Sequence, residues 1–336
     1  MAETRYDVLG IGNALVDVLV EVDDAFVEAE GLPKGGMTLV ERDASDALYQ
    51  KLPSGVEKSG GSCGNTMAGF SALSKGLGGG TGAYIGKVRD DQFGDVFRHD
   101  MTAMGVDFPT AAATDGPGTG KCLVLVTPDA QRTMVTYLGA ASDFTPDDVS
   151  VEAVQAAKIV YLEGYLFDRD AAKAAFVDVA TAAHNAGREV SLTLSDGFCV
   201  DRHRGAFQTL VRDYVDILFA NEQEILSLYE VSSFDEALQA ARRDCRIACL
   251  TRSEKGSVIL MGDEVHVVDA APVDRVVDTT GAGDQYAAGF LYGYSQGYDV
   301  ATAARIGGIM AAEVISHHGA RPEADVAALV RGAINP

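Results

Sequence analysis

The chain has 336 residues, of which 47% are hydrophobic and 23% are charged, a composition typical of a globular enzyme. Acidic residues outnumber basic residues by 49 to 27, giving a formal net charge of −22. This balance argues against nucleic acids and anionic membranes as partners, because both are bound through Lys and Arg. No apolar run approaches the roughly 20 residues that a membrane-spanning helix needs.

Cysteine usage indicates a reduced protein, which we expect to be cytoplasmic. The five cysteines are odd in number, form no Cys-x-x-Cys pair and follow no signal peptide. Cys245 and Cys249 are four residues apart, but no further ligand lies at zinc-like spacing. We interpret these two cysteines as packing thiols.

The N-terminal third contains β-like runs, several of which follow one another without a long helix between them. Residues 6–11 are predicted to form a strand. The further β-like runs are 15–22, 37–40, 120–127 and 132–138. These runs fit a small separate sheet. We therefore expect a single domain over residues 1–336, with a lid inserted from about 13–43 and 108–140.

A glycine-rich segment, Gly60-Gly61-Ser62-Cys63-Gly64-Asn65, precedes a helical run at 66–74. Bare backbone at a helix start leaves its N–H groups open to a ligand, and the Asn65 amide can both donate and accept hydrogen bonds. This chemistry suits a polyol.

From residue 153 onward, short β-rich runs alternate with longer amphipathic runs. The runs are 158–162, 170–186, 189–194, 201–213 and 215–219. Such alternation predicts a parallel sheet that helices cover on both faces, with ligands bound beyond the carboxyl ends of its strands. The turns at 196–197, 221–224 and 281–284 are then expected on one rim.

Asn221 and Glu224 are three residues apart at a predicted helix start and therefore share a face of that helix. Glu224 could position a hydrated Mg²⁺ on bound phosphates. The same pair is also a capping box, in which each side chain satisfies a backbone N–H group of the helix start. The two interpretations are compatible.

The segment Asp278-Thr279-Thr280-Gly281-Ala282-Gly283-Asp284 precedes an apolar run at 286–294 that is predicted to form a buried helix. The small residues Gly281, Ala282 and Gly283 allow an anion to reach backbone N–H groups at the positive end of that helix. Asp284 would repel a bound phosphate but can take a proton from a hydroxyl that attacks it. The alternative is a glycine-rich connector with an Asp that favours the helix dipole.

Two common nucleotide-binding motifs are excluded. The segment 10–13 lacks the third glycine of a dinucleotide fingerprint, and the Gly-Lys pairs at 86–87 and 120–121 lack the flanking residues of a P-loop. If the protein binds ATP, the turn at 281–284 must hold its phosphates.

Together and in this order, the segments 60–65 and 278–284 resemble the motifs of the PfkB, or ribokinase-like, family of carbohydrate and nucleoside kinases. The resemblance extends from Gly10 to about Arg321 and is strongest to the adenosine kinases. The segments that carry this closer likeness are 12–17, 60–65, 119–122, 131–132, 138–141, 219–224 and 305–320. It implies a three-layer α/β/α core with a mainly parallel sheet and a small β-sheet lid.

The resemblance also implies roles for particular residues. On the acceptor side, Asp17, Gly61 and Asn65 would hold the ribose hydroxyls, and Asn13 would lie near the base or sugar. Asp284 would be the general base. Gly281, Ala282 and Gly283 would form the anion hole, and Arg132 would neutralise charge on the transferred phosphoryl group. On the nucleotide side, Asn221, Glu224, Thr251 and Gly256 would contact ATP, with Glu224 near Mg²⁺ through water. Ser253 departs from the family's nucleotide loop, where many members carry Gly.

The implied activity is transfer of the γ-phosphoryl group of MgATP to the 5'-hydroxyl of adenosine. Phe167 and Phe198 are candidates for stacking against the purine. The alternatives are a ribokinase- or fructokinase-type sugar kinase, an inosine or guanosine kinase, and, outside catalysis, a nucleoside-binding sensor. We expect a monomer, with a dimer through the lid as the alternative, and K⁺ near Asp278 as a possible further cofactor.

Overall fold

The larger of two β-sheets organises the molecule. The computed structural model describes residues 3–129 and 131–334, and within them this sheet has nine strands in the order β14-β13-β12-β11-β10-β9-β1-β5-β6. The strands from β12 to β6 are parallel, and β13 and β14 add an antiparallel hairpin at one edge. The bounds are β1 Tyr6–Ile11, β5 Gly82–Ile85, β6 Val106–Asp107, β9 Ala157–Glu163, β10 Glu189–Thr193, β11 Ile217–Asn221, β12 Ile247–Thr251, β13 Ser257–Met261 and β14 Glu264–Val268.

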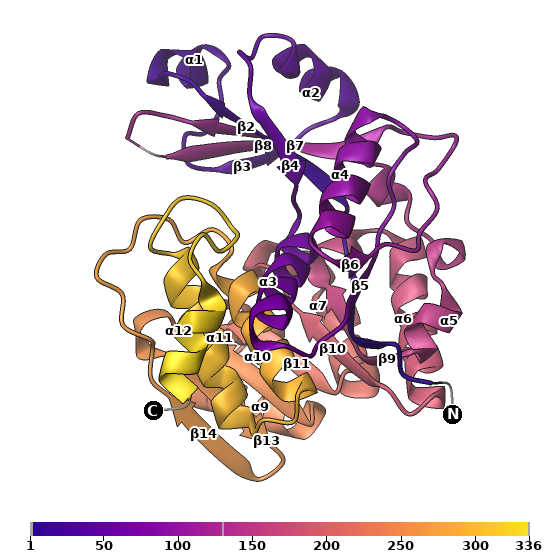
Figure 1. Cartoon of the computed structure of the whole chain (residues 1–336), viewed down its shortest axis with the longest axis vertical. Helices are drawn as coiled ribbons and strands as arrows, with labels where there is room; N and C mark the ends of the chain where they lie inside the picture. The colour runs from indigo at the N-terminus through magenta and orange to yellow at the C-terminus, as the bar shows by residue number, and fades with distance from the viewer. Residues whose placement is uncertain (1–2, 130, 335–336) are drawn as a thin grey trace.

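Helices cover both faces of this sheet (Figure 1). Successive side chains of a strand point to opposite faces, so Val160 and Leu162 of β9 join one hydrophobic cluster while Ile159 and Tyr161 join the other. The first cluster is shared with α5 Val151–Gln155, α6 Asp170–Asn185, α7 Gly197–Tyr214, α8 Glu222–Tyr229 and α9 Phe234–Asp244. The second is shared with α3 Ser62–Leu77, α4 Gln92–Ala103, α10 Ala282–Ser295, α11 Val300–Val314 and α12 Val326–Ile334. The predicted three-layer α/β/α core is confirmed. Among the described helices, none combines the length and apolar character needed to cross a membrane.

A smaller sheet stands apart from the main sheet (Figure 1). In the described part of the chain it has five strands in the order β3-β8-β7-β2-β4. Their bounds are β2 Leu15–Glu21, β3 Met37–Leu39, β4 Val56–Ser59, β7 Thr119–Val126 and β8 Arg132–Gly139. The helices α1 Asp24–Ala29 and α2 Arg42–Tyr49 cover its outer face, where Val18 and Val20 of β2 are buried. The alternate residues of β2, Asp17 and Leu19, face a cavity between the two sheets.

The small sheet is the predicted lid, but its exact limits as a unit stay a prediction. The ranges 13–43 and 108–140 contain β2, β3, β7 and β8, whereas β4 lies between the two ranges. Short 3₁₀ helices occupy several connections: η1 Ala140–Asp143, η2 Pro146–Asp148, η3 Gly164–Asp168 and η4 Ser253–Lys255.

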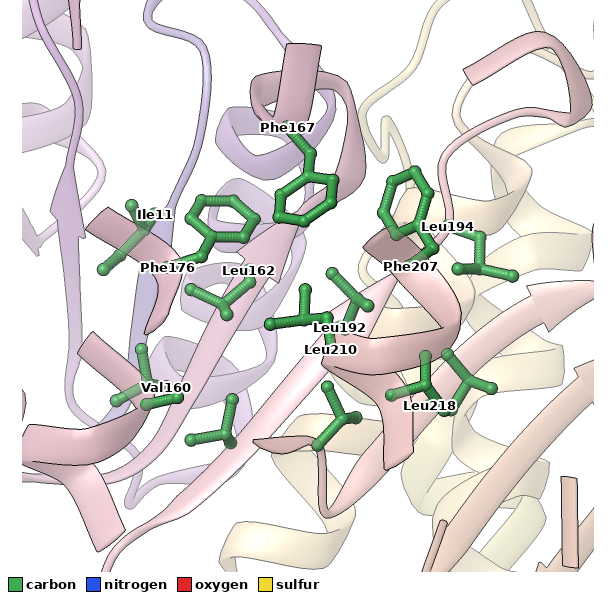
Figure 2. Packing of buried hydrophobic residues seen from close by; sticks show 14 of the residues in the cluster. Ile11, Val160, Leu162, Phe167, Phe176, Leu192, Leu194, Phe207, Leu210 and Leu218 are labelled. Atoms are coloured by element: carbon green, nitrogen blue, oxygen red, sulfur yellow. The ribbon is translucent and has the colours of Figure 1, made fainter. Parts of the chain in front are cut away.

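Aromatic side chains fill the core beneath α6 and α7 (Figure 2). The ring centroid of Phe167 lies 4.6 Å from that of Phe207 and 5.5 Å from that of Phe176. Phe167 is only 3% exposed and points into this cluster with Leu162 and Leu192. Phe167 is therefore a core residue, and of the two stacking candidates only Phe198 lines the cavity.

We predict that Phe207→Ala lowers the free energy of unfolding by about 3–5 kcal/mol, because it leaves a cavity in close-packed surroundings. Phe207 is fully buried, whereas Leu329 of α12 is 45% exposed. The control Leu329→Ala should cost less than about 1 kcal/mol. Urea unfolding of both variants measures the difference, and equal losses would contradict this description of the core.

Candidate active site

A cavity of about 910 Å³ lies between the lid and the carboxyl ends of the main-sheet strands. The predicted site residues that line it are Asn13, Asp17, Gly61, Asn65, Arg132, Asn221, Glu224, Thr251, Gly281, Ala282, Gly283 and Asp284. The structure thus brings together residues from the two ends of the chain and from both sheets. Gly256 is not among the residues that line this cavity; it lies in the turn before β13, with a φ of +77°.

Asp284 joins the two glycine-rich segments. It lies in the first turn of α10, where its Oδ1 accepts a hydrogen bond from Ser62 Oγ at 2.6 Å and its Oδ2 accepts one from Asn65 Nδ2 at 3.2 Å. Burial raises the pKa of Asp284 to about 6, while Ser62, Asn65 and the positive charge of Arg321 act in the opposite direction. The carboxylate is therefore mostly ionised at neutral pH, with a pKa close enough to neutrality for proton transfer.

The turn before α10 has a backbone that requires glycine at residue 281. Gly281 has a φ of +79°, and a Cβ atom at this position would lie 2.6 Å from Ala320 Cα. This conformation directs the chain into the buried helix α10, whose first N–H groups lack intrahelical acceptors. An anion in the cavity can therefore approach these N–H groups and the positive end of the helix dipole.

Arg132 of β8 reaches from the lid to the segment that precedes this turn. Its Nε lies 3.1 Å from Asp278 Oδ2, and both side chains are 12% exposed. Asp278 also accepts hydrogen bonds from the backbone N–H groups of Thr280 and Gly319. These bonds and the charge of Arg132 hold the pKa of Asp278 below its usual range, although burial opposes them. The Asp278 carboxylate thus ties the lid to the anion-binding turn.

Asp17 provides a second carboxylate in the cavity. Burial raises its pKa, and the nearby cations Arg321, Lys58 and Arg132 oppose that shift. A Cβ atom on Gly60 would lie 2.3 Å from the Asp17 carboxylate, so a larger residue at position 60 would displace this side chain. A carboxylate beside bare backbone can accept hydrogen bonds from two neighbouring hydroxyls.

Glu163 follows the predicted strand at 158–162 and is a site residue that no predicted motif contains. Its side chain is 1% exposed; Oε1 accepts from the backbone N–H of Asn13 and from Asn13 Nδ2, and Oε2 accepts from the backbone N–H of Cys63. Burial raises the pKa of Glu163 to about 7, and these hydrogen bonds limit the shift. An acidic residue directly after an apolar strand was the available signal.

Ser62 and Arg321 were also missed as site residues. Ser62 lies inside the glycine-rich segment, where its hydroxyl bonds Asp284. Arg321 follows α11, and its guanidinium donates to Asn65 Oδ1 and Ser59 Oγ, each at 3.1 Å. Nothing local in the sequence indicates these pairings, because Arg321 and Asn65 are 256 positions apart.

Asn221 and Glu224 form the predicted capping box at the start of α8. The Asn221 N–H donates to Glu224 Oε2 at 2.9 Å, the Glu224 N–H donates to Asn221 Oδ1 at 2.9 Å, and Asn221 Nδ2 donates to Glu224 Oε1 at 2.6 Å. Burial raises the pKa of Glu224 to about 7. Because both oxygens of Glu224 are already engaged, contact with a metal through water fits this geometry better than direct ligation. Across the described residues, no three His, Cys, Asp or Glu side chains converge on a possible ion site.

We predict that Gly281→Ala lowers the free energy of unfolding by at least about 1–2 kcal/mol, the cost of a left-handed backbone for a residue with a Cβ atom. Contact with Ala320 adds to this cost. Gly283→Ala is the matched control, because its Cβ atom would meet no other atom within 4 Å and alanine favours the helix. Thermal unfolding should therefore separate the two variants, and equal melting temperatures would contradict the strained turn.

We also predict that the unliganded protein becomes less stable between pH 5.5 and pH 8. Asp284, Glu163 and Glu224 have pKa values raised to about 6, 7 and 7. A raised pKa contributes stability that is complete below the unfolded-state pKa and is lost as pH rises through the folded-state pKa. Carboxyl groups with lowered pKa values, such as Asp7 and Asp278, lose their contribution to stability only below this pH interval. A melting temperature that rises across this interval would contradict the prediction.

Comparison with known proteins agrees with this geometry. Residues 37–326 match the model of the pfkB family carbohydrate kinases. The chain is 30% identical to the adenosine kinase of Saccharomyces cerevisiae over 92% of its own length and 94% of the relative's. Among solved structures, an adenosine kinase from Sinorhizobium meliloti is 47% identical with a TM-score of 0.88, covering 98% of this chain and 100% of that chain. A probable sugar kinase from Rhizobium etli CFN 42 is 46% identical with a TM-score of 0.89, covering 98% and 99%.

The matched range includes most strands of both sheets and both glycine-rich segments, and the yeast relative aligns with 92% of the chain. The chain therefore belongs to the pfkB family of carbohydrate kinases, phosphotransferases that act on a hydroxyl group.

Proposed function

We propose that the protein transfers the γ-phosphoryl group of MgATP to the 5'-hydroxyl of adenosine, giving AMP and ADP. The observation that carries this proposal is the position of Asp284. Its half-buried carboxylate lies at the start of α10 and is bonded to Ser62 and Asn65 at the start of α3. One carboxylate can thus serve an acceptor hydroxyl and lie beside an anion-binding turn. The relatives that are named adenosine kinases support adenosine as the acceptor.

The reaction is a direct in-line displacement. Asp284 takes the proton of the 5'-hydroxyl while the oxygen forms a bond to the γ-phosphorus and the bond from that phosphorus to the ADP oxygen breaks. The N–H groups of Gly281 to Gly283 hold the phosphoryl oxygens, with the α10 dipole adding positive potential. Arg132, whose Nε lies 3.1 Å from Asp278 Oδ2 beside this turn, would neutralise the charge on the transferred group.

On the acceptor side, Asp17, Gly61 and Asn65 bind the ribose hydroxyls, and Asn13 lies near the base or sugar. Phe198 lines the cavity with 78% of its surface exposed, which leaves a ring face for stacking on a purine. Apolar lid side chains, including Leu15 and Leu138, line the same cavity and would exclude water when the lid closes.

On the nucleotide side, we assign ATP contacts to Asn221, Glu224, Thr251 and Gly256. Mg²⁺ bound with ATP neutralises charge on the phosphates. Glu224 would orient this ion through water, while Asn221 keeps the carboxylate in place. We further propose that the protein is a cytoplasmic monomer and that K⁺ near Asp278 is an optional activator.

A free sugar is the second candidate acceptor, because one similar structure is described as a probable sugar kinase. Ribose and ribosides share the vicinal hydroxyls that Asp17 and Asn65 would bind. The two candidates differ only in the base, so an acceptor panel separates them.

We predict saturable ADP release with MgATP and adenosine, and slower release with inosine, guanosine, ribose and fructose. Asp284→Asn should lower kcat by about 10²–10⁴-fold, the effect of losing a general base, with little change in adenosine binding. Asp299→Asn is the matched control, since Asp299 caps the neighbouring helix α11. Turnover of a free sugar alone would replace adenosine as the acceptor, and a normal rate in Asp284→Asn would remove Asp284 from its role.

A further inference from the structure

Arg321 lies where the two glycine-rich segments meet, and neither of them contains it. It belongs to the connection between α11 and α12, and it lines the cavity. The residues before it contact the anion-binding turn: Gly319 N–H donates to Asp278 Oδ2 at 3.1 Å, and Ala320 O accepts from Gln285 Nε2 at 2.9 Å. This short segment therefore touches the α10 side of the site through its backbone and the α3 side through the Arg321 side chain.

The Arg321 guanidinium determines which way the Asn65 amide points. Arg321 Nε donates to Asn65 Oδ1 at 3.1 Å, and a guanidinium has no acceptor atom. The amide must therefore present its oxygen to Arg321, which turns Nδ2 towards Asp284 Oδ2, 3.2 Å away. If the amide were reversed, an amide oxygen would face the carboxylate and the hydrogen bond to Asp284 would be lost.

A second set of contacts fixes the guanidinium itself. It donates to Ser59 Oγ at 3.1 Å and approaches Met104 Sδ at 3.7 Å, while the Ser59 N–H donates to Asp100 Oδ2 at 2.8 Å. Its Nη2 is buried without a hydrogen-bond partner among the described residues. A buried donor without a partner costs free energy, so a purely stabilising role explains this arginine poorly.

We propose that Arg321 is a positioning residue for phosphoryl transfer: it holds the Asn65 amide with its nitrogen towards Asp284 and so aligns the base with the acceptor hydroxyl. This role rests on the proposed function, because it requires Asp284 to act as the base. Arg321 acts through Asn65.

The electrostatic surroundings of Asp284 agree with this role. The charged and titratable groups around it are Asp17, Cys63, Tyr161, Glu163, Tyr165 and Arg321. In this set only Arg321 is a cation, and its charge lowers the pKa of Asp284 while Asp17 raises it. The acidic limb of the plot of kcat/KM against pH reports the pKa of the base. Loss of the arginine should therefore raise this pKa from about 6.

The test is a double-mutant cycle of Arg321→Gln and Asn65→Ala, measured with adenosine and MgATP. We expect Arg321→Gln to lower kcat on the order of 10²-fold, as a small misplacement of reacting groups does, with the KM for MgATP nearly unchanged. On the pH-independent plateau of kcat, the double variant should lose no more activity than Asn65→Ala alone, because both changes remove the same contact. Arg321→Lys should recover part of the rate, since its ammonium can still donate to Asn65 Oδ1.

Two controls distinguish positioning from folding. Arg331→Gln removes an arginine that donates to Gly76 O on the terminal helix α12, away from the cavity, and should retain the normal rate. Thermal unfolding of every variant accounts for lost stability, and general damage would lower the rate equally at all pH values without moving the acidic limb.

Three results would overturn the role of Arg321: an Arg321→Gln rate within about threefold of the wild type, an unmoved acidic limb, or losses from Arg321→Gln and Asn65→Ala that multiply in the double variant. Each of these requires an active wild type. Failure of the wild type to phosphorylate adenosine would instead contradict the proposed function, so the two failures are distinguishable.

Discussion

The half-buried carboxylate of Asp284 is the constraint on which the arrangement of the site depends. A charge that is partly removed from water needs compensating hydrogen bonds. Here the donors are Ser62 and Asn65, at the start of a helix more than 200 residues away in the chain. The first turns of α3 and α10 must therefore meet. Gln285, fully buried beside Asp284, reinforces the junction by donating to the backbone carbonyls of Asn65 and Ala320.

Sheet geometry supplies the other walls of the site. Because β9, β11 and β12 are parallel, their carboxyl ends reach the same rim and bring Glu163, Asn221 and Thr251 to the cavity. The lid contributes through the two-residue period of β2, which buries Val18 and Val20 under its helices and turns Asp17 towards the cavity. The burial of the hydrophobic residues of a strand thus determines which of its polar residues face the cavity.

Local patterns in the sequence predicted the elements well, and long-range partners poorly. The alternation after residue 153 predicted parallel strands and covering helices, because apolar periodicity is a local property. The glycine-rich segments marked Asn65 and Asp284 for the same reason. Glu163 accepts from the Cys63 N–H across 100 positions, and Arg321 donates to Asn65 across 256 positions, and no local pattern contains such contacts. Phe167 shows the converse error, since an aromatic residue near the rim has the same sequence signal in a core as in a binding pocket.

The net charge of −22 makes the local arrangement of cations decisive for an anionic ligand. Lys58, Arg132, Arg202 and Arg321 all line the cavity, although basic residues are the minority in the chain. Salt screens charges beyond roughly 8 Å under physiological conditions, so the acidic surface acts weakly on a phosphate that has entered the cavity. Inside the cavity, the low dielectric strengthens the attraction between a phosphate and the nearby cations and N–H groups of α10. The acidic surface therefore weakens the long-range attraction of ATP without preventing its binding. The few donors around Gly281 and Arg132 determine which anion is bound.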